Sequence, residues 1–336
     1  MKKNKNYFYH LIFITLCILS IKLQAQETKE SSTKGAKIIF DTDMDTDCDD
    51  VGALSMLHTL ADRKEIEILA TTVSSRYSWS APCVGAINRY RDRATLPIGV
   101  PKGAGASDNR GSRYARQIAS EFPCTLKTNK DAPSAVEIYR KILAAAAERS
   151  VTVVTVGYLT NLRDLMESKA DQHSPLNGMK LIRSKVFRLV CMGGRYPEHL
   201  NPAVFGNFKP DPDSAVAVAR SWPGPIYFSG MGAKIMTGYT MPQTPADNPA
   251  RRAYKLYLGG KQTRPSWDQV TLLFAVRPDA PFWKLQTDGY NHIFENGTNQ
   301  WRSQPDKNHI LVSFDAQDRA QITKTIELLM TGISSD

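Results

Sequence analysis

IIFDTDMDTDCDDVGAL, residues 38–54, is the stretch that decides the fold. It opens with an apolar run typical of a buried strand, and it ends in apolar residues at helical spacing. Between them stand six aspartates within ten positions: Asp41, Asp43, Asp45, Asp47, Asp49 and Asp50. So many carboxylates at one strand end repel each other, which raises some of their pKa values or requires a hard cation such as Ca²⁺ or Mg²⁺. A solvated acidic turn is the plain alternative, but the apolar segments on both sides argue against it.

Short apolar runs alternate with helical patterns along the rest of the chain. Strands are expected at 36–40, 66–73, 151–156, 186–192 and 226–229. Helices are expected at 51–60, 81–93, 135–149, from 159, at 213–221 and at 318–330. The helix at 318–330 is expected to pack on the sheet. This alternation indicates βαβ units, and therefore a mostly parallel, Rossmann-like sheet flanked by helices. Neither an internal repeat nor a linker divides the sequence, so residues 36–336 are expected to form a single large α/β domain. Ligands of such sheets bind beyond the carboxyl ends of the strands, where the acidic run lies.

Residues 1–25 have the layout of a secretory signal peptide. Three lysines among the first five residues precede an apolar run at 7–21, and Ala25 supplies a small residue at the cleavage point. The run is shorter than the roughly 20 residues that a membrane span needs, so a stable membrane anchor is not expected. Cleavage would export the protein to the periplasm or the extracellular space, with a flexible segment at 26–35 ahead of the domain.

Composition and charge exclude several classes of protein. An apolar fraction of 42% over 336 residues excludes a disordered or collagen-like chain. The net charge of +10 falls to +6 when the signal peptide, with its four lysines and no acidic residue, is removed. The remaining basic residues form no block interleaved with aromatic residues, so no nucleic-acid partner is expected. The four cysteines after the signal peptide form no metal-binding pattern; Cys83 and Cys124 are the candidate disulfide pair.

Two known uses of an aspartate-rich loop compete for the acidic run. A calcium-binding EF-hand that starts at Asp43 would need Gly at its sixth position and Glu at its twelfth, where Cys48 and Leu54 stand. A haloacid-dehalogenase phosphatase also begins with an apolar strand and D-x-D, with Asp41 as nucleophile and Asp43 as acid. That family has Thr or Val where Asp45 stands, and it does not need the D-D pair that follows. The phosphatase is kept as an alternative.

Five motifs in order resemble the inosine-uridine-preferring nucleoside hydrolase family. The family's opening strand, its D-x-D and its D-D pair correspond to residues 38–50, with two extra residues in the loop. Further along the chain stand VTVVTVGYLTNL at 151–162, MGG at 192–194, NFKPDP at 207–212 and SWD at 266–268. The resemblance implies the nucleoside hydrolase fold and calcium-dependent hydrolysis of the N-glycosidic bond of a ribonucleoside or related N-ribosyl compound. It also implies a role in purine and pyrimidine salvage, a small-molecule ribosyl substrate and a homo-oligomer as one option.

The same resemblance assigns roles to individual residues. The implied calcium ligands are Asp43, Asp50, Asp268, the Val156 carbonyl and, as a substitute from the two-residue insertion, Asp47. Asp49 would be the general base that takes a proton from the attacking water, and Asn207 would bind the ribose.

Three positions depart from the family's pattern and indicate a rebuilt substrate pocket. Arg76 lies where the family has an asparagine that contacts ribose, Phe205 replaces a glutamate, and Trp267 replaces a histidine that handles the leaving group. We expect Arg76 and Arg195 to suit an anionic group, Trp267 and Tyr196 to stack on a base, and His199 and Asn201 to contact the ribose. The missing glutamate keeps a second alternative open, an exported calcium-dependent nucleoside or sugar binder without catalysis.

Overall fold

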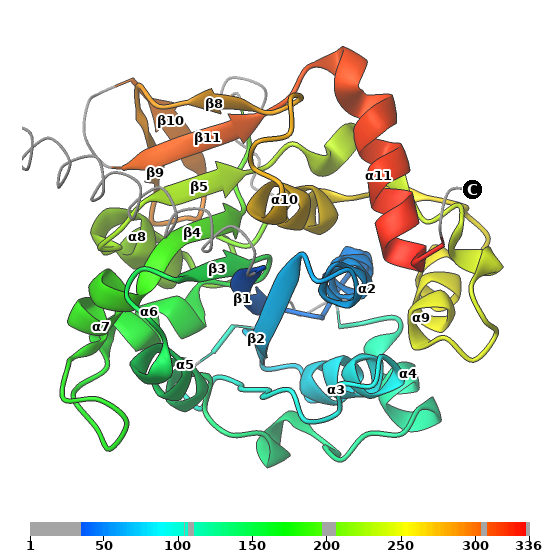
Figure 1. Cartoon of the computed structure of the whole chain (residues 1–336), viewed down its shortest axis with the longest axis horizontal. Helices are drawn as coiled ribbons and strands as arrows, with labels where there is room; N and C mark the ends of the chain where they lie inside the picture. The colour runs from blue at the N-terminus through cyan, green and yellow to red at the C-terminus, as the bar shows by residue number, and fades with distance from the viewer. Residues whose placement is uncertain (1–34, 104, 107–110, 197–205, 304–307, 334–336) are drawn as a thin grey trace, which may run out of the picture.

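The computed structural model describes residues 35–103, 105–106, 111–196, 206–303 and 308–333. Its centre is a seven-stranded sheet with the order β2-β1-β3-β4-β5-β11-β8 (Figure 1). The strands are β1 (Ala36–Thr42), β2 (Ile66–Val73), β3 (Val151–Thr155), β4 (Val186–Met192), β5 (Ile226–Ser229), β8 (Lys284–Gln286) and β11 (His309–Ser313). All neighbours pair in parallel except the edge strand β8, which is antiparallel to β11. The predicted single α/β domain with a mostly parallel sheet is confirmed.

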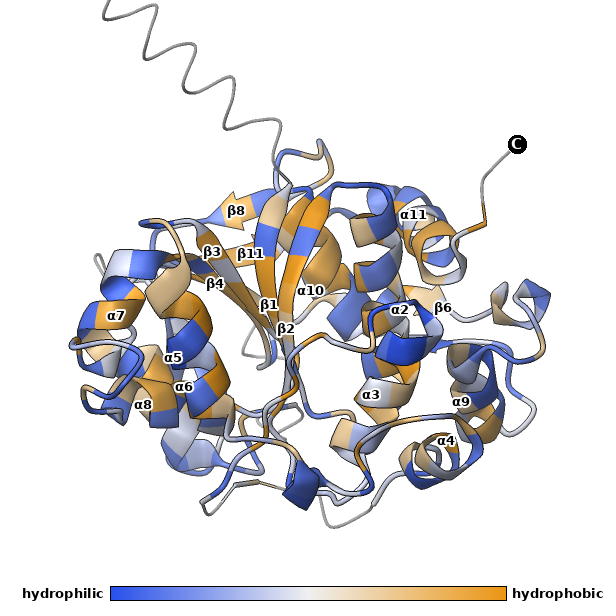
Figure 2. Cartoon of the chain, turned by 60° about the horizontal axis from the view of Figure 1, so that its bottom comes forward, coloured by the Kyte–Doolittle hydropathy of each residue, from blue (hydrophilic) through white to orange (hydrophobic). Residues whose placement is uncertain are grey.

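Helices cover both faces of the sheet, so the apolar central strands lie between two helical layers (Figure 2). One layer contains α5 (Ala135–Ala145), α6 (Thr160–Glu167), α7 (Gly178–Lys185) and α8 (Pro212–Ser221). The other contains α2 (Asp49–Asp62), α3 (Ser80–Tyr90), α4 (Ala115–Glu121), α9 (Pro249–Leu258), α10 (Trp267–Val276) and α11 (Arg319–Thr331). Because both faces are covered, the central strands read as continuous apolar runs rather than as alternating ones.

The acidic run begins where β1 ends, and it is held between the two layers. Ile38 and Phe40 pack into the core on the α2 side, and Ile39 packs into the core on the α5 side. Nearly every residue of α2 is buried, because this helix lies between the sheet, α10 and α11. Burial on every side explains why α2 lacks the solvent-exposed polar face of a surface helix, and it fixes the position of the loop between β1 and α2.

The strand order places a ligand site at the end of β1. The chain leaves β1 for β2 on one side and later returns to β3 on the other side, so β1 and β3 flank a topological switch point. Loops that leave the carboxyl ends of two such strands diverge and open a crevice between them, where ligands of parallel sheets bind. The loops after β1 and β3 carry the acidic run and Val156.

The C-terminal third differs most from the prediction. Its strands β6 (Met236–Thr237), β7 (Arg264–Pro265), β8, β9 (Tyr290–Ile293), β10 (Asn299–Arg302) and β11 were not expected. Strands of two to five residues carry only a weak periodic sequence signal. The last helix, α11, was expected to pack on the sheet, but it packs mainly against α2.

Other predictions about the chain meet the structure only in part. The four cysteines within the described ranges, including Cys83 and Cys124, are free. The predicted signal peptide at 1–25 and nearly all of the segment at 26–35 lie outside the described residues. Among the helices that the structure describes, none is long and apolar enough to cross a membrane.

Candidate active site

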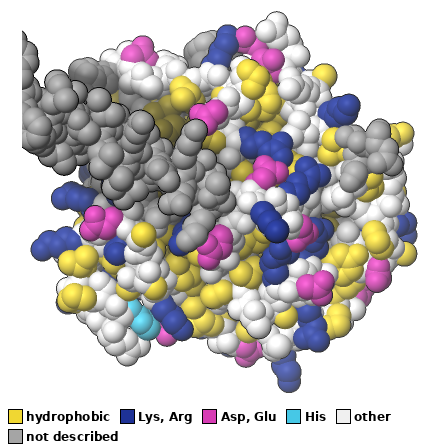
Figure 3. All heavy atoms as spheres, in the orientation of Figure 1, with side chains coloured by type: hydrophobic (Ala, Val, Ile, Leu, Met, Phe, Trp, Pro, Cys, Tyr) yellow, Lys and Arg dark blue, Asp and Glu magenta, His cyan; other side chains and the backbone are white. Residues whose placement is uncertain are grey.

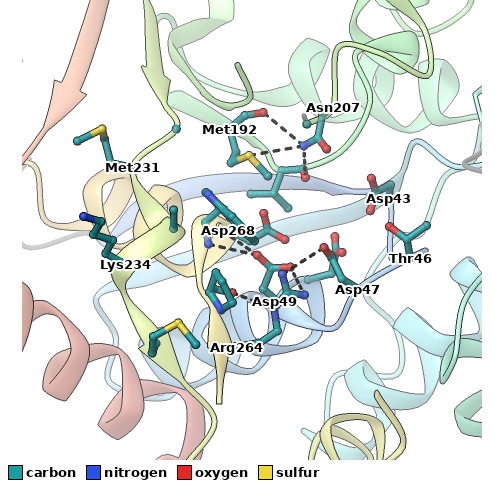
Figure 4. Close-up of a pocket in the computed structure, with 18 of the residues that line it drawn as sticks. Asp43, Thr46, Asp47, Asp49, Met192, Asn207, Met231, Lys234, Arg264 and Asp268 are labelled. Carbon is teal, nitrogen blue, oxygen red and sulfur yellow. Dashed lines mark hydrogen bonds and ion pairs between the residues drawn. The ribbon is translucent and has the colours of Figure 1, made fainter. Parts of the chain in front are cut away.

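A cavity of about 1110 Å³ opens at the carboxyl end of the sheet (Figure 4). Its walls come from the loops after β1, β3, β4 and β5 and from the start of α10. The predicted proton acceptor, the predicted metal ligands and two of the predicted substrate contacts line it: Asp43, Asp47, Asp49, Asp50, Val156, Asn207, Trp267 and Asp268. The fold therefore brings together residues that are up to 225 positions apart in the sequence.

Five carboxylates form the floor of this cavity, and we call Asp43, Asp47, Asp49, Asp50 and Asp268 the aspartate cluster. Burial raises the pKa of Asp50 to about 7, and the negative charge of Asp47 adds to this effect, although hydrogen bonds from Thr42 and Met44 oppose it. Burial and the neighbouring carboxylates also raise the pKa values of Asp43 and Asp268 well above their usual range. The cluster is thus a concentration of negative charge that the low-dielectric interior penalises.

The arrangement of the cluster fits a hard divalent cation. Asp47, Asp49 and Asp50 each place a carboxylate oxygen within 4.8 Å of the other two. Oδ1 of Asp268 is buried and has no hydrogen-bond partner among the described residues. A buried carboxylate oxygen without a donor is costly unless a cation compensates it. Carboxylate oxygens are also the ligands that Ca²⁺ prefers, so the donor set fits this ion.

Arg264 is the functional residue that the sequence analysis missed. Its side chain is only 5% exposed, and it lies 2.8 Å from Oδ1 of Asp49 and 3.1 Å from Oδ2 of Asp47. The guanidinium lies over the rings of Tyr257 and Trp267, with centroid distances of 5.2 and 5.5 Å. A buried guanidinium held between two rings and two carboxylates offsets part of the negative charge of the cluster.

Asp49 is the most constrained carboxylate of the cluster. Its Oδ1 faces Arg264. Its Oδ2 accepts hydrogen bonds from two backbone N–H groups, that of Trp267 at 3.2 Å and that of Asp268 at 3.5 Å. Burial raises its pKa above the usual range, while the charge of Arg264 opposes that rise. These contacts join the loop after β1 to the start of α10, where a carboxylate is favoured by the helix dipole.

Asn207 and Trp267 lie on the walls above the aspartate cluster. The side-chain amide of Asn207 donates to the carbonyl of Val156 at 2.5 Å. A carbonyl oxygen has two lone pairs, so this bond leaves one available for another partner. Trp267 lines the cavity beneath the Arg264 guanidinium, and it is partly exposed there.

The remaining predicted contacts divide into two groups. Arg195 and Tyr196 line the cavity, whereas the exposed Arg76 is not among its lining residues. His199 and Asn201 lie outside the described residues, as does Phe205.

Asp41, the nucleophile of the phosphatase alternative, faces away from the cavity. It is fully buried, and its carboxylate accepts hydrogen bonds from the hydroxyl of Tyr139 at 2.8 Å and from the amide of Asn161 at 3.1 Å. Burial raises its pKa to about 6, against the effect of these donors. A carboxylate enclosed in this way cannot reach a substrate phosphorus, so the geometry argues against the phosphatase.

Comparison with protein families decides between these alternatives. The sequence profile of the inosine-uridine preferring nucleoside hydrolases matches residues 38–304. The chain belongs to this family. It is therefore a hydrolase of N-glycosidic bonds that acts on small ribosyl substrates, and both the phosphatase and the non-catalytic binder are set aside.

Solved structures of nucleoside hydrolases share the fold of this hydrolase. A plant nucleoside hydrolase superposes with a TM-score of 0.65 at 17% identity, covering 89% of this chain and 99% of that one. An inosine-guanosine nucleoside hydrolase superposes with a TM-score of 0.64 at 18% identity, covering 89% of this chain and 100% of that one. The purine-preferring ribonucleoside hydrolase of Gardnerella vaginalis superposes with a TM-score of 0.61 at 18% identity, covering 88% of this chain and 100% of that one. No curated protein sequence matches the hydrolase.

Proposed function

We propose that this hydrolase cleaves the N-glycosidic bond of a ribonucleoside or related N-ribosyl compound in a reaction that depends on Ca²⁺. The observation that carries the calcium dependence is the buried Oδ1 of Asp268, which has no donor among the described residues and lies in a cluster of five carboxylates. Such a group is stabilised by a hard cation more effectively than by any neutral partner.

The cation would be held by Asp43, Asp50, Asp268, the carbonyl of Val156 and, from the inserted residues, Asp47. A bound Ca²⁺ supplies positive charge that orients the attacking water and lowers its pKa. Arg264 leaves Asp43, Asp50 and Asp268 to the cation, because its own contacts are with Asp47 and Asp49.

In this proposal Asp49 accepts the proton of the attacking water. Arg264 and the first amides of α10 hold its carboxylate in one orientation and favour its ionised form. The same contacts reduce its affinity for a proton, so Asp43, which lines the cavity without a cationic partner among the described residues, is the competing acceptor.

The walls of the cavity would position the substrate. Asn207 offers an amide at the edge of the aspartate cluster for the ribose hydroxyls, and the partly exposed Trp267 offers a ring for the base. His199 and Asn201 remain proposed ribose contacts on the evidence of the sequence alone.

The proposal is tested by following ribose release from a panel of nucleosides, with and without a chelator. We expect release that stops when Ca²⁺ is removed and returns when it is restored. Asp49→Asn should abolish release but keep the stabilisation of the fold by Ca²⁺, whereas Asp43→Asn should lose both. If Asp49→Asn still releases ribose, Asp49 is not the proton acceptor. If the wild-type protein releases ribose from no compound, yet binds one in a chelator-sensitive way, the hydrolase proposal fails.

We also propose that the protein is exported and then acts in the periplasm or the extracellular space. The support is the basic, apolar and small-residue pattern of residues 1–25. Expression of the full chain followed by cell fractionation and N-terminal sequencing tests it. We expect a mature N-terminus close to residue 26 outside the cytoplasm, and an intact cytoplasmic chain would refute export.

A further inference from the structure

The charged residues that line the cavity are divided between an acidic floor and a cationic surround. The acidic side chains are those of the aspartate cluster, with which Arg264 pairs, and the other cations are Arg113, Arg195, Lys234, Lys261 and Arg319. On the face shown in Figure 3, Lys and Arg side chains are interspersed with Asp and Glu. Because five cations line the cavity besides Arg264, it suits a ligand that carries negative charge away from the floor.

Lys234 and Arg319 are two cations of this surround with which no acidic side chain of the described residues pairs. Lys234 ends η3 (Gly232–Lys234), the turn after β5, and Arg319 is the first residue of α11. Neither forms an ion pair within the described part of the chain, and Nε of Arg319 is buried there without a hydrogen-bond partner. Asp315, an acid close by in the sequence, pairs instead with Lys284 at 2.6 Å. An arginine in the first turn of a helix also opposes the helix dipole, so α11 itself does not account for it.

The surroundings of these two residues favour binding of an anion. Met231, Met236 and Phe314 line the cavity together with them. Apolar side chains beside a cation lower the local dielectric, which strengthens its attraction for an anionic group. Arginine binds phosphate oxygens through a planar fork, and lysine adds a point charge, so the pair suits a phosphate.

Lys234 lies apart from the aspartates within the cavity. Figure 4 shows Lys234 and Asp43 at opposite ends of the cavity, with Asp268 between them. The volume of 1110 Å³ slightly exceeds the upper end, about 1,000 Å³, of the range usual for small-molecule pockets. A substrate can therefore place its ribosyl group over the aspartates and a second, anionic group beyond it.

We propose that Lys234 and Arg319 bind a phosphate group of the substrate, so that the preferred substrates are phosphorylated N-ribosides such as nucleoside 5′-phosphates. This inference rests on the proposed hydrolysis at the aspartate cluster. The oxygen of water bonds to C1′ while the C1′–N bond breaks, and the electron pair of that bond leaves with the base. The proton removed from water ends on the leaving nitrogen, so the products are the free base and ribose 5-phosphate.

The test compares inosine and inosine 5′-phosphate as substrates of the full chain. The double variant Lys234→Gln/Arg319→Gln removes both cations, and Lys141→Gln/Arg220→Gln removes the same charge from exposed positions outside the cavity. We expect wild type and control to prefer the phosphorylated substrate. In Lys234→Gln/Arg319→Gln the ratio of the two kcat/KM values should fall about 100-fold, roughly tenfold for each charge-assisted hydrogen bond, chiefly through KM. Inorganic phosphate should compete with the phosphorylated substrate in wild type but not in this variant.

The outcomes separate this inference from the proposed function. A ratio that is equal in wild type and Lys234→Gln/Arg319→Gln, in a variant that unfolds at the same temperature as the control, overturns the phosphate site and leaves hydrolysis standing. If wild type hydrolyses neither compound, the nucleoside panel decides the proposed function, and calorimetric binding of inosine 5′-phosphate decides the site. Binding that is weaker in Lys234→Gln/Arg319→Gln than in the control then supports the phosphate site, and equal or absent binding overturns it.

Discussion

Two sets of buried polar side chains differ in where their hydrogen bonds are made. In the first set, which we call the buried network, Asp41 accepts from Tyr139 and Asn161 on the α5 side of the sheet. On the α2 side, His58 bonds Asn88 at 2.9 Å, and Asn88 donates to Thr71 at the same distance; these contacts complete the buried network. Within the described residues, Oδ1 of Asn161 and Nδ1 of His58 are its only atoms without a partner. In the aspartate cluster, Oδ1 of Asp268 has no hydrogen-bond partner among the described residues, and the buried guanidinium of Arg264 contacts Asp47 and Asp49.

The difference indicates what each group does. A buried polar group with partners inside the protein contributes to stability, and removing one partner costs free energy of unfolding. A buried charge without a partner costs free energy of unfolding in the free protein, and it is retained where a ligand supplies the missing charge. The buried network should therefore affect stability, and the aspartate cluster should affect ligand binding and catalysis.

The largest effect is expected for Asp268→Asn. Hydrolysis should fall by at least about 100-fold, because an oxygen ligand of the cation is lost. In chelator the variant should unfold at a urea concentration no lower than wild type does, because the substitution removes an uncompensated buried charge. Addition of Ca²⁺ at 100 times its Kd should raise the free energy of unfolding of wild type by about 2.7 kcal/mol and leave that of Asp268→Asn unchanged. Kinetic assays and urea unfolding, with the exposed Asp279→Asn as control, check this. An Asp268→Asn variant that keeps the calcium effect would remove Asp268 from the ligand set.

The next effect concerns the single guanidinium of the cluster. Arg264→Gln leaves Asp47 and Asp49 without their cation, so the free energy of unfolding in chelator should fall by about 3 kcal/mol. Ca²⁺ should restore part of this loss, which makes the calcium effect larger than in wild type. Arg140, equally buried but paired with Asp171, provides the matched control. Arg140→Gln should lose stability with an unchanged calcium effect. If the calcium effect is the same in both variants, Arg264 does not act on the cation site.

The buried network should produce a smaller, pH-dependent effect through His58. Burial, the main cause, lowers the pKa of His58 from 6.5 to about 3, so the unfolded chain takes up a proton more readily than the folded one. The stability linked to His58 is complete above pH 6.5 and is lost as the pH falls toward 3, by about 2 kcal/mol at pH 5. Urea unfolding at pH 7.5 and pH 5 should show this loss in wild type and in His173→Gln, but not in His58→Gln. An equal loss in all three proteins would contradict the assignment.

The smallest effect is expected for Tyr139→Phe, which removes one donor to Asp41 without touching the cavity. The free energy of unfolding should fall by about 1.5 kcal/mol, as is usual for a hydrogen bond to a charged group. Hydrolysis and the calcium effect should change by less than about twofold. Tyr239→Phe, at a position that is 61% exposed, should change none of the three quantities. A large loss of activity in Tyr139→Phe would join the two groups into one functional unit.

Much of the site was predictable because its residues follow strands. Asp43 comes directly after β1, Asp49 and Asp50 open the next helix, and Val156 comes directly after β3. Carboxyl ends of parallel strands meet at one edge of the sheet, so residues at these positions converge whatever the details of packing. Asp268 and Asn207 were found through motifs that resemble those of the family, because no strand of the sheet directly precedes either residue.

The sequence by itself determined the parallel sheet, the acidic loop at its edge and the concentration of carboxylates there, because strand periodicity and the residues at strand ends are local properties. Only the tertiary structure decided that Asp41 faces Tyr139 and Asn161 in the core, and that Arg264 pairs with Asp49 from more than 200 residues away. No local signal distinguishes Arg264 from the other arginines of the chain. Its role arises because packing of α9 and β7 beside the loop after β1 leaves the guanidinium buried, where its charge must be matched.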